Sequence, residues 1–545
     1  MNSVLDIFRR WNNIAGWSVF AVSAAVYLMT AEPTVSFWDC GEFILSAFRL
    51  QVGHPPGAPL FLMLGRVATF FAGGDVLKVA FTVNSFSAIC SALTILFLFW
   101  SVTHLVRRVV SRDGELQAKH ILPVIGSGAA GALAYTFSDT FWFSAVEGEL
   151  YALSSLCTAL VFWTMLKWEE EADKPYAGRW IILTAYIIGL SLGIHRLNLL
   201  VIPVLVFVVY FKKYEISGKG ILNTLLTAIL TLGFMVFVLI PGVPKAAGWF
   251  ELFFVNALGL PYNTGLFVFL AAVTVLLVAG IRYSIRKKNI ILNYIITALT
   301  VIMIGHSSYA MIMIRSSARP PMNQNNPSDI FALGYYINME QYGSAPLLFG
   351  PYYSAPAIDV KNRVSGYNKV DGKYEPYYRP EYKYDNRFET VFPRMYSRDP
   401  EHEQAYTYWA GIRGKKYTIT SGSGKRTLVC PTFGENLKFF FRYQAGFMYF
   451  RYFMWNFAGR QNDIQGNGNK IHGNWISGFR FIDNARLGSQ DQLPSELLEN
   501  PGRNRYYMLP LLLGIAGILW QYRRDRKGLF LVFLFFFMTG LAIIV

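Results

Sequence analysis

Charged residues are scarce in this chain, at 15% of 545 residues, whereas apolar residues make up 53% and aromatic residues 16%. Soluble globular proteins carry about 25% charged residues, so this composition excludes an ordinary soluble protein. The formal net charge is nevertheless +16. The Lys and Arg residues fall in short clusters between apolar runs, which indicates membrane topology and not a nucleic-acid partner. The sequence therefore predicts a polytopic α-helical membrane protein embedded in a lipid bilayer.

Cysteine is also rare, with four residues at positions 40, 90, 157 and 430. Four scattered cysteines exclude a disulfide framework, and no CxxC pair or His/Asp cluster has the spacing of a metal site. Cys40 and Cys430 would share one compartment in the topology below. We expect two free thiols there in preference to a disulfide.

Eleven apolar segments approach the roughly 20 residues that a membrane-spanning helix needs. Arg9 and Arg10 precede the first segment, and this arrangement resembles a signal peptide. A retained signal anchor is favoured, because the acidic residues Asp39 and Glu42 follow the segment directly. Short basic loops alternate with loops that hold the carboxylates of Asp39, Glu42, Glu147 and Glu149. The side of the membrane that carries these carboxylates is therefore expected to be extracytoplasmic. The expected spans are 14–31, 79–106, 120–137, 148–167, 179–195, 197–211, 221–241, 264–281, 290–314, 506–521 and 528–545.

The expected domain organisation has three parts. Residues 1–314 form a transmembrane catalytic region, with a first outer loop at about 32–78 that holds short interfacial helices over 41–74. Residues 315–505 form a soluble extracytoplasmic α+β insert, with two strands around a Gly/Ser turn over 417–430 and a helix on the membrane surface from Leu437 to Phe457. Residues 506–545 form C-terminal transmembrane helices, and an end inside an apolar run without a basic flank is expected of a truncated chain.

The first acidic motif, Asp39 and Glu42, directly follows the first apolar segment. Their spacing of three places both carboxylates on one face of a helical turn. One alternative is helix capping, because acidic residues favour the first turn of a helix. An ionisable residue at a membrane edge is costly unless it is used, and the neighbouring Trp38 and the His54-Pro-Pro-Gly loop favour a functional site.

Further polar candidates interrupt the apolar sequence on the same expected face. In SDTFWFSAVEGELYALSS, the outer ends of the third and fourth expected spans hold Asp139, Glu147 and Glu149. Solvated loop acids are the alternative, which explains Asp139 equally well. Glu149 begins an apolar helix and is the better functional candidate. The motif LSLGIHRLNLL contributes His195, Arg196 and Asn198. A structural role in a tight loop is the alternative for these three residues.

Arginine side chains complete the candidate set after the ninth apolar segment. Arg315 and Arg319 lie at the membrane edge, where arginines often only reach for lipid headgroups. Two prolines follow Arg319 and fix its backbone, so Arg319 is the more specific candidate for phosphate binding. We predict that the phosphate of a group-donating substrate is bound by His54, His195, Arg196 and Arg319. The site for the group-accepting substrate, or a second acidic site, is predicted at Glu147, Glu149 and Asn198.

Carboxylates and phosphate-binding cations on one face of a membrane protein favour a transferase with a lipid-phosphate donor. Transfer of a sugar from such a donor needs one carboxylate base for the acceptor hydroxyl and cations for the departing phosphate. The competing class is a transporter or flippase, which would show broken helices in two related halves. No such repeat is present in the sequence.

The run FWDCGEFILSAFRLQVGHPPGAPLFLMLGR, with VEGELYALSSL and GLSLGIHRLNLL, resembles the bacterial membrane family DUF2723, glycosyltransferase family 117, related to the protein O-mannosyltransferases of the GT-C superfamily. The resemblance covers residues 10–350 and implies a GT-C-like fold with the catalytic acid in the first outer loop, which is Asp39 with Glu42 as its neighbour. Protein O-mannosyltransferases carry adjacent Asp and Glu there, whereas two residues intervene here, so the choice between Asp39 and Glu42 stays open.

The same resemblance implies the substrates and the location. The donor is expected to be a polyprenyl-phosphate sugar, with mannose as the sugar, and the acceptors Ser or Thr hydroxyls of exported proteins. Transfer is expected to invert the anomeric centre, with Asp39 as general base and neither a cofactor nor a metal. The expected location is the bacterial inner membrane, with the active face in the periplasm.

Overall fold

The computed structural model describes residues 3–111, 115–343, 345–421 and 424–544, and it divides the chain into two compact units. Unit 1 contains residues 1–339, 369–374 and 516–539. Unit 2 contains residues 340–368, 375–515 and 540–545. The domain boundaries expected at residues 314 and 505 stay a prediction.

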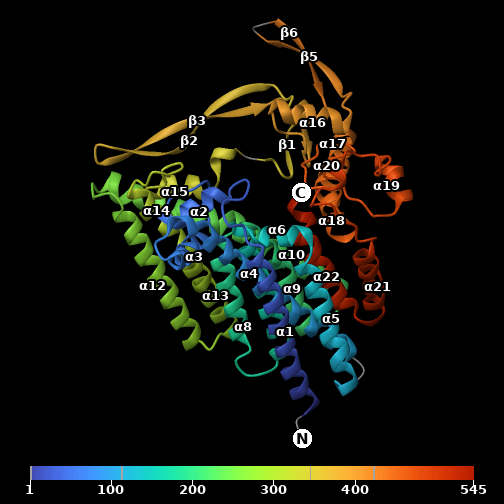
Figure 1. The fold of residues 1–545 in the computed structure, drawn as a ribbon. Helices are drawn as coiled ribbons and strands as arrows, with labels where there is room; N and C mark the ends of the chain where they lie inside the picture. The colour runs from blue at the N-terminus through green and yellow to red at the C-terminus, as the bar shows by residue number, and fades with distance from the viewer. Residues whose placement is uncertain (1–2, 112–114, 344, 422–423, 545) are drawn as a thin grey trace. The chain divides into compact units, whose positions relative to one another are not determined.

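Unit 1 is built from helices, because long runs rich in Leu, Ile, Val and Phe can satisfy their backbone hydrogen bonds in lipid only within helices or closed barrels (Figure 1). In chain order the helices of unit 1 are α1 Val4–Met29, α2 Cys40–Arg49, α3 Pro59–Thr69, α4 Val79–Val110, α5 Ala118–Thr136, α6 Asp139–Ala145, α7 Leu150–Glu171, α8 Gly178–Leu192, α9 Ile202–Lys213, α10 Gly218–Gly233, α11 Ile240–Leu252, α12 Thr264–Arg286, α13 Ile290–His306, α14 Ala310–Ser317, α15 Ile330–Ile337 and α22 Arg526–Thr539.

Seven of the described helical segments are long and apolar enough to cross a membrane, so the expected eleven spans are not confirmed. The segment 120–137 forms α5, which is bent by 69° against α6 and would raise the count to eight. The segment 179–195 becomes α8, which has only 15 residues because a turn at Gly193 ends it. The segment 197–211 splits into a 3-10 turn and α9, and 506–521 becomes the 16-residue helix α21, Leu509–Arg524.

Another span is longer than expected. The sequence pattern placed the end of the seventh segment at Pro241, but the helical segment continues from Gly218 to Ala257. A π-helical turn, Phe234–Leu239, precedes Pro241, which lies in the first turn of α11. Proline is tolerated at the start of a helix, so here it does not end the span.

Polar contacts between helices hold the N-terminal part of unit 1 together. Helices α1, α4 and α5 pack side by side (Figure 1). The buried Tyr27 hydroxyl donates to the Thr136 carbonyl at 2.9 Å, and the hydroxyl groups of Ser23 and Thr136 are 2.9 Å apart. Helix α1 is therefore an integral part of the helical unit.

The first loop contains short helices, as expected for residues 41–74. After α2 and α3 come two 3-10 turns, Phe70–Ala72 and Val76–Lys78. An isolated parallel bridge joins Val52 to Asn323, and the Arg315 Nε donates to the Leu50 carbonyl at 2.7 Å. The last turn of α14 and the segment that follows it thus fix the loop that carries the acidic motif.

Unit 2 combines strands of 3 to 14 residues with helices. β1 Phe349–Pro351 pairs with β4 Glu389–Val391, β2 Ala357–Val370 with β3 Lys373–Tyr384, and β5 Lys415–Ser421 with β6 Gly424–Cys430, each in a separate two-stranded sheet. The last pair confirms the two strands expected over 417–430; their turn lies outside the described residues. Further helices of this region are α16 Pro400–Ala410, α17 Phe433–Phe439, α18 Arg451–Phe457, α19 Arg480–Leu487 and α20 Ser495–Leu498.

The helix expected from Leu437 to Phe457 is also present. An 11-residue π-helical stretch, Phe440–Phe450, joins α17 to α18. The guanidinium of the buried Arg451 lies 3.9 Å from the ring centre of Phe447. A position of this helix on the membrane surface stays a prediction. All four cysteines are free thiols, as the sequence favoured.

Candidate active site

Glu42 lies at the centre of the polar cluster in the first loop. Its Oε1 accepts hydrogen bonds from the His54 backbone N–H at 2.6 Å and lies 2.8 Å from His54 Nδ1. Its Oε2 accepts a hydrogen bond from Gln324 Nε2 at 3.2 Å. Because both carboxylate oxygens are engaged, Glu42 fixes the loop around His54.

Asp39 approaches the same imidazole from the other side. Its Oδ2 lies 4.0 Å from His54 Nε2, and its side chain is 60% exposed against 21% for Glu42. Asp39 stands at the N-cap of α2, yet its side chain makes no capping hydrogen bond. The capping alternative therefore does not explain this carboxylate.

The loop between α6 and α7 adds two buried carboxylates. Glu147 Oε2 accepts a hydrogen bond from Ser36 Oγ at 2.8 Å. The Asp39 backbone N–H donates to the Glu149 carboxylate. The third motif is linked through Tyr151, whose ring centre is 5.8 Å from that of His195. Residues from three separate stretches of sequence thus meet at the start of α7.

The charges in this cluster change one another's protonation. The hydrogen bond to Glu42 raises the pKa of His54 above its usual value, against the opposing effect of burial. Burial raises the pKa of Glu42, but the hydrogen bonds from His54 outweigh it and leave this pKa lowered. Burial, together with the negative charges of Glu147 and Asp39, raises the pKa of Glu149 to about 7. Burial likewise raises the pKa of Glu147.

The raised pKa of Glu149 predicts that folding stability depends on pH. The folded state holds this proton more tightly than the unfolded chain, whose carboxyl titrates near 4.5. The stabilisation is therefore complete below about pH 4.5 and is lost as the pH rises through about 7. We expect the Glu149→Gln variant to lose less thermal stability than the wild type between pH 5 and about pH 8. Identical pH profiles of the melting temperature in detergent would contradict this assignment.

Several contacts in the site were not predicted from the sequence. Gln324 lies 282 residues from Glu42 in the chain, and Tyr336 donates its hydroxyl hydrogen to the Gly53 carbonyl at 2.6 Å. The hydrogen bond from Ser36 to Glu147 was likewise not predicted. The polar run MNQNNPSD beside Arg319 was visible in the sequence, but no local pattern pairs it with the first loop.

The four cations expected at the donor phosphate have different surroundings. His54 lies among the carboxylates, whereas Arg196 hydrogen-bonds to Tyr309 and its pKa is lowered by burial. Burial also lowers the pKa of His195. The Arg319 side chain is exposed, its backbone has a left-handed φ of 51°, and its guanidinium makes no hydrogen bond or ion pair with another described residue.

Asn198 has a structural contact of its own. Its Oδ1 accepts hydrogen bonds from Ser154 Oγ at 2.7 Å and Thr158 Oγ1 at 3.2 Å, which joins α7 to the 3-10 turn Arg196–Val201. Its Nδ2 is buried and has no partner among the described residues. The described residues also contain no group of three His, Cys, Asp or Glu side chains arranged to hold a metal ion.

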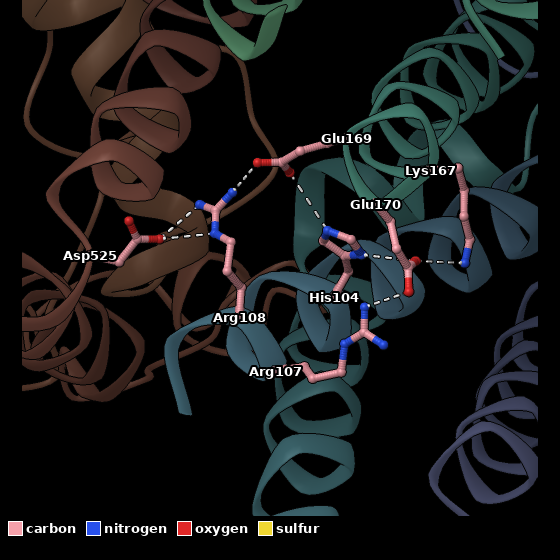
Figure 2. Close-up of polar contacts among 7 residues, drawn as sticks. All are labelled: His104, Arg107, Arg108, Lys167, Glu169, Glu170 and Asp525. Carbon is pink, nitrogen blue, oxygen red and sulfur yellow. Dashed lines mark hydrogen bonds and ion pairs between the residues drawn. The ribbon is translucent and has the colours of Figure 1, made fainter. Parts of the chain in front are cut away.

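A second polar cluster lies at the far end of α7 (Figure 2). Arg108 bridges Glu169 and Asp525 at 2.7 Å each, and Arg107 pairs with Glu170 at 2.8 Å. Glu169 follows Glu149 by 20 residues along α7, so about 30 Å separate this cluster from Glu149, close to the thickness of a bilayer core. These ion pairs fasten α4, α7 and the α21–α22 turn at the opposite end from the carboxylates.

The N-terminal region of the chain is similar to a known protein family. Residues 39–217 match the family model "Protein O-mannosyl-transferase TMEM260 N-terminal domain". This stretch of the chain resembles an O-mannosyltransferase domain. The match begins at Asp39 and includes every residue predicted for the catalytic, phosphate-binding and acceptor sites except Arg319. Residues 343–441 match a second model, described as a family of unknown function, DUF8416.

Two curated relatives carry the same name. The mouse protein O-mannosyl-transferase TMEM260 is 28% identical over 231 residues, which are 41% of this chain and 29% of the relative. The Dictyostelium discoideum protein of that name is 27% identical over 195 residues, 34% of this chain and 22% of the relative. The similarity thus spans less than a third of each relative. No solved structure matches the chain. DUF2723 and the GT-C fold stay predictions.

Proposed function

We propose that this protein is a membrane glycosyltransferase that moves mannose from a polyprenyl-phosphate donor to Ser or Thr hydroxyls of exported proteins. The observation that carries this proposal is the exposed Asp39 carboxylate, 4.0 Å from an imidazole that Glu42 holds in place, within the stretch similar to the TMEM260 domain. The carboxylate face would be periplasmic in a bacterial inner membrane, and the fold GT-C-like.

In the proposed reaction Asp39 accepts the proton of the acceptor hydroxyl. The hydroxyl oxygen then forms a bond to the anomeric carbon of mannose, while the bond from that carbon to the phosphate oxygen breaks. The phosphate departs with the electron pair on the lipid. Attack from the face opposite the phosphate inverts the anomeric centre, and no cofactor is needed.

His54 is the best placed of the four proposed phosphate-binding residues. The Glu42 hydrogen bond raises its pKa and so favours the imidazolium, which can stabilise the negative charge of the departing phosphate. His195, Arg196 and Arg319 would bind more distant parts of the donor. Glu147, Glu149 and Asn198 remain a proposed acceptor site or second acidic site.

The transferase can be tested against the alternative, a transporter or flippase of lipid-linked or small polar substrates. The purified protein is incubated in detergent with radiolabelled polyprenyl-phosphate-mannose and a Ser/Thr peptide. A transferase leaves label on the peptide. A flippase leaves the peptide unlabelled in detergent but moves the labelled lipid between leaflets of proteoliposomes, and that pair of results would overturn the proposal.

A further inference from the structure

Three arginines surround a surface hollow at the C-terminal end of α2. The hollow has a volume of about 440 Å³ and is lined by Phe48, Arg49, Leu50, Arg66 and Arg315. The Arg49 and Arg66 guanidinium groups lie 4.6 Å and 5.5 Å from the ring centre of Phe48. None of the lining residues is acidic, although the cations come from three different helices.

Helix capping accounts for part of this arrangement. Arg66 Nη1 donates to the Phe48 carbonyl at 2.6 Å, and Arg315 Nε donates to the Leu50 carbonyl at 2.7 Å. The last carbonyls of a helix need such donors. Arg49 caps nothing, because its guanidinium makes no hydrogen bond with another described residue. Capping thus leaves donors of all three arginines unused, since each guanidinium has five N–H groups.

The three positive charges also lack counter-ions. No described Asp or Glu forms an ion pair with Arg49, Arg66 or Arg315. Like charges held around one hollow repel each other, and an anion in the hollow would remove that cost. Arginine donors match the geometry of phosphate oxygens, so phosphate is the anion that this arrangement suits best.

The surroundings of the hollow indicate a lipid. Arg315 lies in the last turn of the candidate span Ile290–Ser317, where a membrane-spanning helix meets the headgroups. Along α3 and the turn after it, Leu64, Val67, Phe70 and Phe71 form a stripe of exposed apolar side chains. Phe70 contacts Arg66 at 4.9 Å. A ligand with a phosphate and an acyl chain could use the arginines and this stripe together.

We propose that this hollow binds the phosphate group of an anionic bilayer lipid. The site is separate from the proposed reaction centre, because Arg49 ends α2 and Asp39 precedes its ten residues, about 15 Å away along the helix. A phosphate at the hollow is therefore too far from Asp39 to be the group that leaves in sugar transfer. The lipid instead fixes the first loop against the membrane edge, and this inference does not depend on the proposed activity.

The test measures binding of a fluorescent phosphatidylglycerol to the purified full chain in detergent, without sugar donor or acceptor. Arg49→Gln removes a cation that caps nothing and should weaken binding about tenfold, the loss expected for one charged hydrogen bond. Arg282→Gln, on α12, removes an exposed cation elsewhere in unit 1 and should leave binding unchanged. Phosphatidylcholine should bind more weakly than phosphatidylglycerol, and inorganic phosphate at the same concentration should not displace the lipid.

Three results would overturn this inference. Equal binding of phosphatidylglycerol by the wild type and Arg49→Gln would remove the hollow as the site. Equal affinity for phosphatidylglycerol and phosphatidylcholine would show that the net charge of the lipid is not recognised. Displacement by inorganic phosphate at equal concentration would identify free phosphate, and not a lipid, as the ligand.

Discussion

Replacing Asp39 with Asn is expected to slow mannose transfer by on the order of 10²–10⁴-fold while donor binding stays near the wild-type level. The substitution keeps the shape of the side chain and removes its basicity. Asp39 makes no capping hydrogen bond, so the fold of α2 should not depend on its charge. The measurement is the turnover rate at saturating donor, with donor affinity measured separately.

Glu42→Gln is the matched control for Asp39→Asn. Both Glu42 oxygens already accept hydrogen bonds, so this carboxylate is less available as a base. We expect Glu42→Gln to be about tenfold slower than the wild type, through a displaced His54 and a less stable loop. An inactive Glu42→Gln beside a fully active Asp39→Asn would reassign the base to Glu42. Full activity of both variants would reject the carboxylate mechanism of this loop.

Gly53→Ala is expected to reduce transfer by about 100-fold, because it displaces Glu42 without changing any charge. A Cβ atom at Gly53 would overlap the Glu42 carboxylate. That carboxylate cannot move aside freely, since His54 and Gln324 both bind it. The effect should appear in the turnover rate of a folded protein whose melting temperature remains measurable.

Gly131→Ala provides the control for that substitution. A Cβ atom at Gly131, on α5, would have no neighbouring atom within 4 Å. We expect this variant to keep wild-type transfer and to be no less stable, since alanine favours helix more than glycine does. If Gly53→Ala is as active as Gly131→Ala, then the position of the Glu42 carboxylate does not matter for transfer.

Much of the helical architecture could be predicted from the sequence, because the length of an apolar run and the positive charge of a loop can be read from consecutive residues. The i,i+3 spacing of Asp39 and Glu42 predicted that both carboxylates lie on one side of the first turn of a helix, and both approach His54. The short helices of the first loop were expected because Arg49, Arg66 and the prolines interrupt the apolar sequence there. The strands over 417–430 followed from turn residues between apolar runs.

The features that were predicted wrongly or missed depend on contacts between residues that are far apart in the sequence. Helix α8 ends after 15 residues because the chain turns at Gly193 to pack against the first loop, where the Leu60 N–H donates to the Gly193 carbonyl at 2.8 Å. Gln324 and Tyr336 reach the first loop through tertiary packing that no local pattern contains. Arg108 lies in the last turn of α4, but its acidic partner Asp525 is 417 residues away in the sequence.

Photo-crosslinking of a donor analogue tests whether the donor sugar binds beside Asp39. A polyprenyl-phosphate-mannose analogue with a photoreactive group on the sugar is bound to the purified protein and irradiated, and the labelled peptides are identified by mass spectrometry. We expect labels within residues 36–54 and 147–151, where Asp39, His54 and Glu149 meet. Labels confined to the ion-pair cluster around Arg108 and Asp525, at the other end of α7, would contradict it.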